Sequence, residues 1–412
     1  MSSCPISRRG VVSLGLTIPL ALLTACSPTD AASSQAGSGD SSPNVASHTF
    51  RNPDLGCGFF EPTASLELAY AQSFTVDYYE GGFALICVIT GERFLVIPAG
   101  KDVPSELAPD IQPIQLPLQN IYLVSTSMIS LVDAVGALDA VGMTSVTAEA
   151  SPNERLTQLI NDGTVVYGGR YSAPDYELIT ASGCTFALEN TKLNHVPEVR
   201  DKLTELGVTV FCEQSSSERE ALGRLEWIKL IGVLFERENE AQRHFDALAE
   251  RITTIAAQAP TNKTITFFYV NEDGAIATRR ATDYFAQMVE LAGGTYKSFD
   301  PDGGDAASGE TDGSGNTSSV QLVVNLEEFY VRAQEADVMV YNTTVDESVT
   351  SMSDLVAKNA LLADLKAVQA GAVWACDHEM YQQIASMDAI IGDIRSALLD
   401  EEPAAGFLWR LP

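Results

Sequence analysis

Basic residues and histidines are scarce in this sequence, and each shortage excludes a class of partner. Lys and Arg together number 25 against 55 Asp and Glu. This acidic balance argues against binding to nucleic acid and against electrostatic attraction to anionic lipid. The four histidines are too few for a bare zinc or manganese ion, whose site needs several His and carboxylate ligands to converge. We therefore expect no cofactor and no protein-bound metal.

Local enzyme signatures are also missing. The sequence contains no Gly-x-Ser-x-Gly elbow and no His-Glu-x-x-His helix, the arrangements that position a hydrolase serine or a catalytic zinc. We expect no enzyme activity. A hydrolase remains the least favoured alternative, because catalytic triads assemble from residues far apart in a sequence.

One apolar run stands at the beginning of the chain. Arg8 and Arg9 precede an apolar stretch over 11–23, and Leu-Thr-Ala then leads to Cys26, which is the order of a secretory signal peptide. Small residues before a cysteine resemble a bacterial lipobox. That resemblance implies removal of residues 1–25, a lipid on Cys26 and a position on the extracytoplasmic face of a bacterial cell membrane.

The residues after Cys26 are polar and small. Residues 26–49 hold almost nothing that could form a core, so we expect a flexible tether, and no later run is apolar and long enough to span a bilayer. Five cysteines then remain, without a Cys-x-x-Cys spacing. We expect mostly buried thiols, and a Cys57–Cys87 disulfide stays open.

Alternating strand and helix patterns fill the rest of the chain. Three short strands over 74–97 form a small antiparallel entry, and a Pro-rich connection follows over 104–117. Apolar strand-like runs then alternate with helical runs, which predicts a parallel sheet flanked by helices. We expect a first α/β lobe over 50–216 and, where the same pattern restarts, a second α/β lobe over 260–412.

A single helix is expected between the two lobes, over 217–259. Apolar residues recur at spacings of three and four from Leu222 to Phe235 and then from Ala241 to Ile255. Ser217 and Glu220 match a capping box at its start, and Pro260 follows its end. Such a helix would be roughly 55 to 60 Å long and would bridge the lobes.

The stretch 300–319 interrupts the second lobe. It is acidic, rich in glycine and poor in apolar residues, so we expect a disordered surface insertion. Its carboxylates do not follow the spaced-ligand pattern of a calcium loop.

This arrangement and several local segments resemble the helical-backbone class (class III) of periplasmic-type solute-binding proteins. The segments are Tyr171 to Glu177 (YSAPDYE), Leu222 to Lys229 (LGRLEWIK), Asp283-Tyr284 followed by Leu291 to Gly294 (LAGG), and Ala367 to Trp374. The resemblance implies a receptor for an ABC importer of ferric siderophore, haem or cobalamin. Relatives often carry Ser-His-Pro before Leu-Gly-Arg. Here Arg219-Glu220-Ala221 stands in that place, so no histidine role is carried over.

In open α/β sheets ligands bind outside the carboxyl ends of the strands, and this rule selects loops that carry aromatic and polar side chains. The candidate ligand-binding residues are Tyr171, Ser172, His195, Arg279, Arg280, Tyr284, Asn342 and Tyr381. The two arginines offer planar forks for the carboxylates of an anionic chelate, or they belong to a solvated turn. The tyrosines offer rings that stack on a ligand or pack between lobes.

The resemblance also implies partners. Members of this class present one acidic residue per lobe to the permease, and Glu177 and Glu327 fall at the matching positions, where the helix dipole alone also favours glutamate. The expected partners are ABC permease subunits, a small-molecule metal chelate and membrane lipid, with the chain itself a monomer. The alternative function is a lipid-anchored haem- or cobalamin-binding or sensing module.

Overall fold

Runs of β-branched and aromatic residues form the first sheet of the chain. In the computed structural model, which describes residues 49–57, 61–151, 153–300, 321–376 and 378–412, this sheet has the strand order β1-β2-β3-β4-β5. Its strands are β1 (Ala64–Ser65), β2 (Phe74–Tyr78), β3 (Ala84–Val88), β4 (Arg93–Ile97) and β5 (Ile111–Gln115). The expected antiparallel entry is therefore present, whereas Cys26 and most of the tether and of the insertion lie outside the described residues.

Strand β5 was not expected, because it lies inside the Pro-rich connection. It pairs in parallel with β4 and carries Pro113, which a strand tolerates at the edge of a sheet. Proline has no backbone N–H to donate, but the carbonyl of Pro113 accepts a hydrogen bond from the Thr209 hydroxyl, 3.1 Å away. The first sheet thereby adjoins the next one.

The second sheet is parallel and has the order β12-β11-β6-β7-β8. Its strands are β6 (Ile121–Leu123), β7 (Val141–Thr144), β8 (Val166–Tyr167), β11 (Phe186–Glu189) and β12 (Thr209–Cys212). The helices between them are α1 (Thr126–Ala134), α2 (Glu154–Asn161), α3 (Tyr176–Ser182) and α4 (Pro197–Glu205). Successive strand residues alternate between two hydrophobic cores, so both faces of the sheet are covered.

The second lobe contains a seven-stranded sheet. Its strands are β13 (Thr264–Val270), β14 (Ile276–Arg279), β15 (Thr295–Tyr296), β16 (Gln321–Val324), β17 (Val338–Tyr341), β18 (Val373–Cys376) and β19 (Leu408–Arg410). Strands β13, β17 and β18 are parallel, and β14 and β19 are antiparallel to their neighbours. Asn359 adopts an extended backbone and so ends the helix that begins at Met352.

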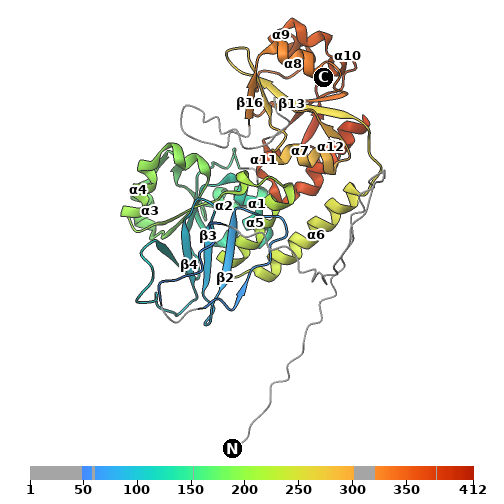
Figure 1. Cartoon of the computed structure of the whole chain (residues 1–412). Helices are drawn as coiled ribbons and strands as arrows, with labels where there is room; N and C mark the ends of the chain where they lie inside the picture. Colours follow the sequence, from blue (N-terminus) through green and yellow to red (C-terminus); the bar gives the residue numbers. More distant parts are fainter. Residues whose placement is uncertain (1–48, 58–60, 152, 301–320, 377) are drawn as a thin grey trace, which may run out of the picture. The chain divides into compact units, whose positions relative to one another are not determined.

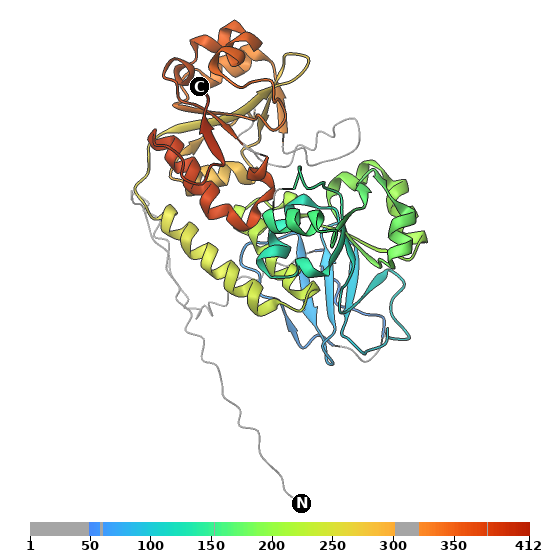
Figure 2. The same cartoon turned by 180° about the vertical axis from the view of Figure 1, so that it is seen from behind.

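The helices of this lobe lie on both faces of its sheet (Figures 1 and 2). On one face are α8 (Leu326–Ala333), α9 (Met352–Lys358) and α10 (Lys366–Gln369), and on the other are α7 (Tyr284–Leu291), α11 (Glu379–Gln382) and α12 (Met387–Leu399). The second group shares a continuous hydrophobic core with α1, α5 (Ala221–Leu234) and α6 (Glu238–Ala256). The two lobes are therefore packed through helices.

The expectation of one unbroken helix over 217–259 is wrong. The chain forms α5 and then α6, and Glu236 between them has a left-handed φ of 56°. The capping box is also absent, because Glu220 is the N-cap of α5 and its side chain makes no cap hydrogen bond. Helix α6 runs between the two lobes (Figure 1), and its 19 residues span roughly 28 Å.

Helix α5 is buried along its whole length, including its charged residues. The Glu226 carboxylate accepts hydrogen bonds from the backbone N–H groups of Ala69, Tyr70 and Ala71 at 2.8–3.1 Å, and pairs with Lys229 at 2.8 Å. These bonds compensate the buried charge of the carboxylate, and they also satisfy the backbone N–H groups of the segment that leads into β2. No helix in the described part of the chain is long and apolar enough to cross a membrane.

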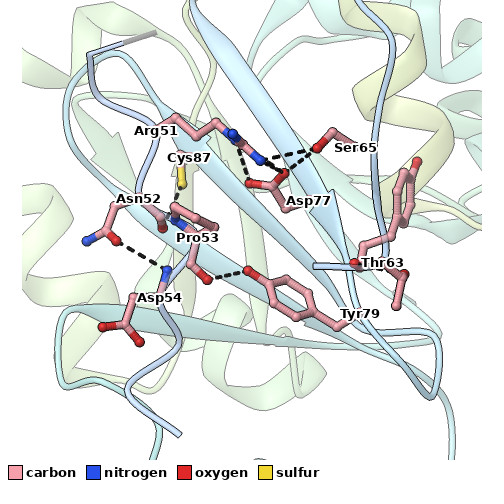
Figure 3. Close-up of polar contacts among 10 residues, drawn as sticks. Arg51, Asn52, Pro53, Asp54, Thr63, Ser65, Asp77, Tyr79 and Cys87 are labelled. Atoms are coloured by element: carbon pink, nitrogen blue, oxygen red, sulfur yellow. Dashed lines mark hydrogen bonds and ion pairs between the residues drawn. The ribbon is translucent and has the colours of Figure 1, made fainter. Parts of the chain in front are cut away.

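The first described residues are fastened to the antiparallel sheet by side chains (Figure 3). The Arg51 guanidinium donates to both carboxylate oxygens of Asp77, which is fully buried, and to the Ser65 hydroxyl. The Tyr79 hydroxyl donates to the carbonyl of Pro53. Residues 49–57 thereby cover the outer face of this sheet, where Leu55 joins its core.

Replacing Arg51 should destabilise this sheet, because Asp77 would keep a buried charge without its cation. We expect Arg51→Met to lower the free energy of unfolding by about 1 to 3 kcal/mol, measured by urea denaturation. The matched control is Arg243→Met, which removes an exposed pair with Glu240 at 3.5 Å and should cost about 0 to 0.5 kcal/mol. Equal losses in the two variants would contradict the role given to Arg51.

Candidate functional site

The carboxyl ends of β6, β7, β8, β11 and β12 meet at one edge of the first-lobe sheet, since all five strands are parallel. At the centre of this edge the Glu213 carboxylate, which is 2% exposed, accepts hydrogen bonds from the hydroxyls of Ser125 and Ser127 at 2.9 and 3.0 Å. It also accepts the Ser215 N–H at 2.6 Å. An internal carboxylate thus sits at the positive end of α1.

Three of the predicted ligand-binding residues lie on loops at this edge. Tyr171 and Ser172 form the tip of a hairpin between β9 (Gly169–Arg170) and β10 (Ala173–Pro174), where the tyrosine ring packs partly against the core and the serine is exposed. His195 ends a short 3₁₀ helix and is exposed. The edge is as the sequence predicts, and a ligand role for these three residues stays a prediction.

In the second lobe, Asn342 directly follows β17 and is 1% exposed. Its side-chain oxygen accepts the Thr344 hydroxyl at 2.6 Å and the Cys376 thiol at 3.6 Å, while Thr343 donates to the carbonyl of Cys376 at 2.7 Å. Asn342 therefore joins the loops after β17 and β18, and its amide points into the protein.

Arg279, Tyr284 and Tyr381 are brought together, but in a buried position between the lobes. Arg279 is 8% exposed, pairs with Asp283 at 3.2 Å and lies 5.0 Å from the ring centroid of Tyr381. The rule that selected Arg279 does not apply to it, because β14 is antiparallel to β13 and ends away from the edge shared by the parallel strands. Burial also raises the pKa of the Tyr381 hydroxyl well above its ordinary value, so this side chain is a neutral phenol.

Arg224 of α5 completes this cluster, and no role was predicted for it. Its guanidinium lies 4.4 Å from the ring centroid of Tyr284, and its Nη2 donates to the carbonyl of Tyr381 at 2.9 Å. Tyr284 and Tyr381 thus contact an arginine of the first lobe. The packing role that the sequence left open for both tyrosines is the one that these contacts support.

Arg280 also contacts an acidic residue. Its Nη1 donates to Asp300 at 3.0 Å, and the other carboxylate oxygen of Asp300 accepts the Ala281 N–H at 2.7 Å. The two arginines expected to bind an anionic chelate therefore both contact a carboxylate of the chain itself.

A cavity of about 310 Å³ lies between the lobes, where the loops after β7 and β18 approach each other. It is lined by Ser151, Asn153, Glu154, Thr157, Gln158 and Glu379. The sequence rule selected the loop after β18, through Tyr381, but not the loop after β7. A second cavity, of about 480 Å³, lies at the amino ends of the strands beside the break between α5 and α6, away from the edge where α/β folds bind ligands.

Glu177 and Glu327 occupy equivalent local positions. Each lies in the first turn of a helix whose N-cap, Asp175 or Asn325, accepts a backbone N–H at 2.9 or 2.8 Å. Because the caps already serve the helix ends, both glutamate side chains are left exposed. Among the described residues neither glutamate forms an ion pair.

Within the described ranges, no three His, Cys, Asp or Glu side chains gather as a metal site. The Cys57 and Cys87 thiols are free, so the disulfide that the sequence left open is not formed. Four of the five cysteines are buried, as expected.

One buried carboxyl group at the carboxyl-end edge of the first-lobe sheet has no hydrogen-bond partner in the described structure. Glu189, the last residue of β11, is fully buried, and neither of its side-chain oxygens is bonded. Burial raises its pKa from 4.5 to about 8, against the opposing attraction of Arg200. Glu189 is therefore protonated in the folded protein at neutral pH.

This burial predicts that stability falls as pH rises from about 5 to 8, because the unfolded chain releases the Glu189 proton near pH 4.5 and the folded chain keeps it until about 8. Glu189→Gln removes this difference. The variant should match the parent at pH 5 and exceed it by about 2 to 4 kcal/mol at pH 8.5, measured by urea unfolding across pH. Exposed Glu240→Gln is the control, and a pH-independent difference at Glu189 would refute the assignment.

Comparison with known proteins agrees with this geometry. The model of the family described as "Periplasmic binding protein" matches residues 124–380, and an uncharacterized lipoprotein of Methanocaldococcus jannaschii is 22% identical over 360 residues, or 81% of this chain and 82% of that protein. Two solved structures share the fold, each covering 68% of this chain. The haem-binding protein HutB of Vibrio cholerae has a TM-score of 0.52 with 15% identity over 99% of its length, and the petrobactin-binding protein YclQ from Bacillus subtilis has 0.51 with 14% over 92%.

The family match covers more than half of the 412 residues, and the two lobes joined by α6 are the helical-backbone arrangement expected from the sequence. The family and these structural neighbours are solute-binding proteins and not enzymes. The chain therefore belongs to the periplasmic binding protein family, in its helical-backbone class.

Proposed function

We propose that this chain is the solute receptor of an ABC importer, that it captures an iron complex between its lobes, and that a lipid on Cys26 holds it on the extracytoplasmic face of the membrane. The observation that carries this proposal is the polar cavity between α2 and α11, which lies beyond the carboxyl ends of the strands, where open α/β sheets bind ligands. The neighbouring structures are named for haem and petrobactin, and they support an iron-bearing ligand.

A complexed metal fits the residues better than a bare ion does. A bare ion needs several converging side-chain ligands, and the described residues offer no such group. A chelate brings its own ligands and requires only a shaped, hydrogen-bonding cavity. Haem or cobalamin, in a receptor or a sensing module, is the second candidate, because a haem-binding protein shares this fold.

The lipid anchor would keep the receptor close to its permease. A lipid and the flexible tether over 26–49 would raise the effective concentration of the receptor there. The lipoprotein relative supports the anchor. The strongly acidic composition leaves lipid insertion, and not charge, to hold the protein at the membrane.

Native mass spectrometry of the chain that starts after Cys26 tests the ligand class. We expect a co-purifying iron chelate, or saturable binding when ferric hydroxamates, ferric catecholates and haemin are added one at a time. Bound iron chelates also quench tryptophan emission, and Trp374 lies in β18 two residues from its end. Absence of binding to every chelate and to haemin would overturn the proposed ligand class.

Glu177 and Glu327 are proposed to dock the receptor on basic sockets of the permease. The double replacement Glu177→Ala, Glu327→Ala should reduce chelate uptake by cells at least about tenfold, since two exposed charge pairs at an interface are lost, and should leave chelate binding in solution unchanged. The matched control is Glu198→Ala, Glu250→Ala, which removes two other exposed helical glutamates. Normal uptake by the Glu177, Glu327 variant would refute the docking role.

A further inference from the structure

The charged side chains around the interlobe cavity indicate the charge of the captured solute. Arg279 and Arg280, the basic residues expected to meet an anionic chelate, contact Asp283 at 3.2 Å and Asp300 at 3.0 Å. Arg279 is also 8% exposed. An anionic solute would have to draw these guanidinium groups away from carboxylates that already hold them.

The wall of the cavity that α2 forms is built from hydrogen-bonding groups. Asn153 caps α2 through its side-chain oxygen, which accepts the Leu156 N–H at 2.9 Å, and its amide donates to Asp133 at 2.8 Å. Ser151 donates to the carbonyl of Asn153 at 3.0 Å. These contacts fix the position of the residues that precede Glu154.

The opposite wall is α11, and first-lobe side chains hold it in place. Arg224 donates to the carbonyl of Tyr381 at 2.9 Å, and the Ser130 hydroxyl donates to the carbonyl of Gln382 at 3.1 Å and accepts the Ala385 N–H at 3.3 Å. Successive backbone groups of α11 and the turn after it are thus bonded to α1 and α5. The wall that carries Glu379 is therefore formed before a solute enters.

The lining itself is uniform in character. Its six residues supply hydroxyl groups, amides and two carboxylates, and no Lys, Arg or His is among them. Arg155 follows Glu154 on α2 and is exposed, but it is not part of the lining. Glu154 and Gln158 are exposed and the other four lining residues are partly exposed, so an anionic group placed here would gain two like-charged neighbours, whereas a cation or a hydrogen-bond donor would gain acceptors.

We propose that the solute presents neutral or positively charged, hydrogen-bond-donating groups to this cavity, and that Arg224 and Ser130 position the α11 wall that receives them. This proposal rests on the proposed function, because it assigns the cavity to the captured chelate. It also replaces the expectation that paired arginines bind an anionic complex.

Two ferric chelates of opposite charge test the proposal with the chain that starts after Cys26. The cationic ferric complex of desferrioxamine B should bind at least about tenfold more tightly than a trianionic ferric catecholate, measured by tryptophan quenching. Glu154→Gln, Glu379→Gln should weaken the cationic complex about tenfold, and salt should weaken it in the parent but little in this variant. Glu198→Gln, Glu250→Gln is the matched control.

Hydrogen exchange tests the positioning role separately from any ligand. Arg224→Met and Ser130→Ala should speed amide exchange over 379–385 and leave β17 unchanged, with Arg224→Lys and Ser130→Thr closer to the parent. Tighter binding of the catecholate, or an unaltered Glu154, Glu379 variant, would overturn the solute assignment while the proposed function stands. Binding of neither chelate and no haemin would overturn both. Exchange that rises equally in β17 would overturn the positioning role.

Discussion

The structure depends on burying helix α5 on every side. All fourteen of its residues are buried, so its charged side chains must find partners inside the protein. Glu226 binds three backbone N–H groups that lead into β2 and pairs with Lys229. Arg224 reaches the second lobe. One helix therefore joins the antiparallel sheet and the second lobe around it, through bonds that water cannot replace.

This arrangement explains why the predicted binding residues separate into two groups. Tyr171, Ser172 and His195 follow parallel strands and lie on the exposed edge of the first lobe. Arg279, Tyr284 and Tyr381 lie against α5, because the helices on that face of the second-lobe sheet share its core. Side chains that complete this core are held by packing, and the interlobe cavity is left to residues of α2 and α11.

The sequence predicted the alternation of strands and helices well, because that pattern depends on local periodicity. It failed at the break between α5 and α6. Spacings of three and four hold up to Phe235 and again from Ala241, and the six-residue step between these two positions does not by itself indicate a break, because no proline marks the end of α5. The visible signal is Gly232, where an added Cβ would lie 2.7 Å from that of Ala241. The close approach of two helices is a tertiary fact that periodicity does not report.

The candidate site was predictable only where a rule about strand ends was sufficient. It selected the loop after β18, where Glu379 lies two residues before the predicted Tyr381, but not the loop after β7, and Glu154 and Thr157 carry no motif. It misplaced Arg279, because the direction of β14 follows from a hairpin with β13 and not from composition. Arg224 stood in a recognised segment, yet its role requires knowing what packs against it.

Two buried carboxyl groups at the carboxyl ends of the first-lobe strands differ in the hydrogen bonds that they receive. Glu213 and Glu189 both stand at strand ends and are both buried, but Glu213 receives two hydroxyls and a backbone N–H at the start of α1, whereas Glu189 receives none from the described residues. Burial without such hydrogen bonds favours the neutral form of Glu189. The loops at this edge therefore differ in the hydrogen-bond donors that they supply, and a solute that brings its own donors would supply them to the acceptors of the cavity.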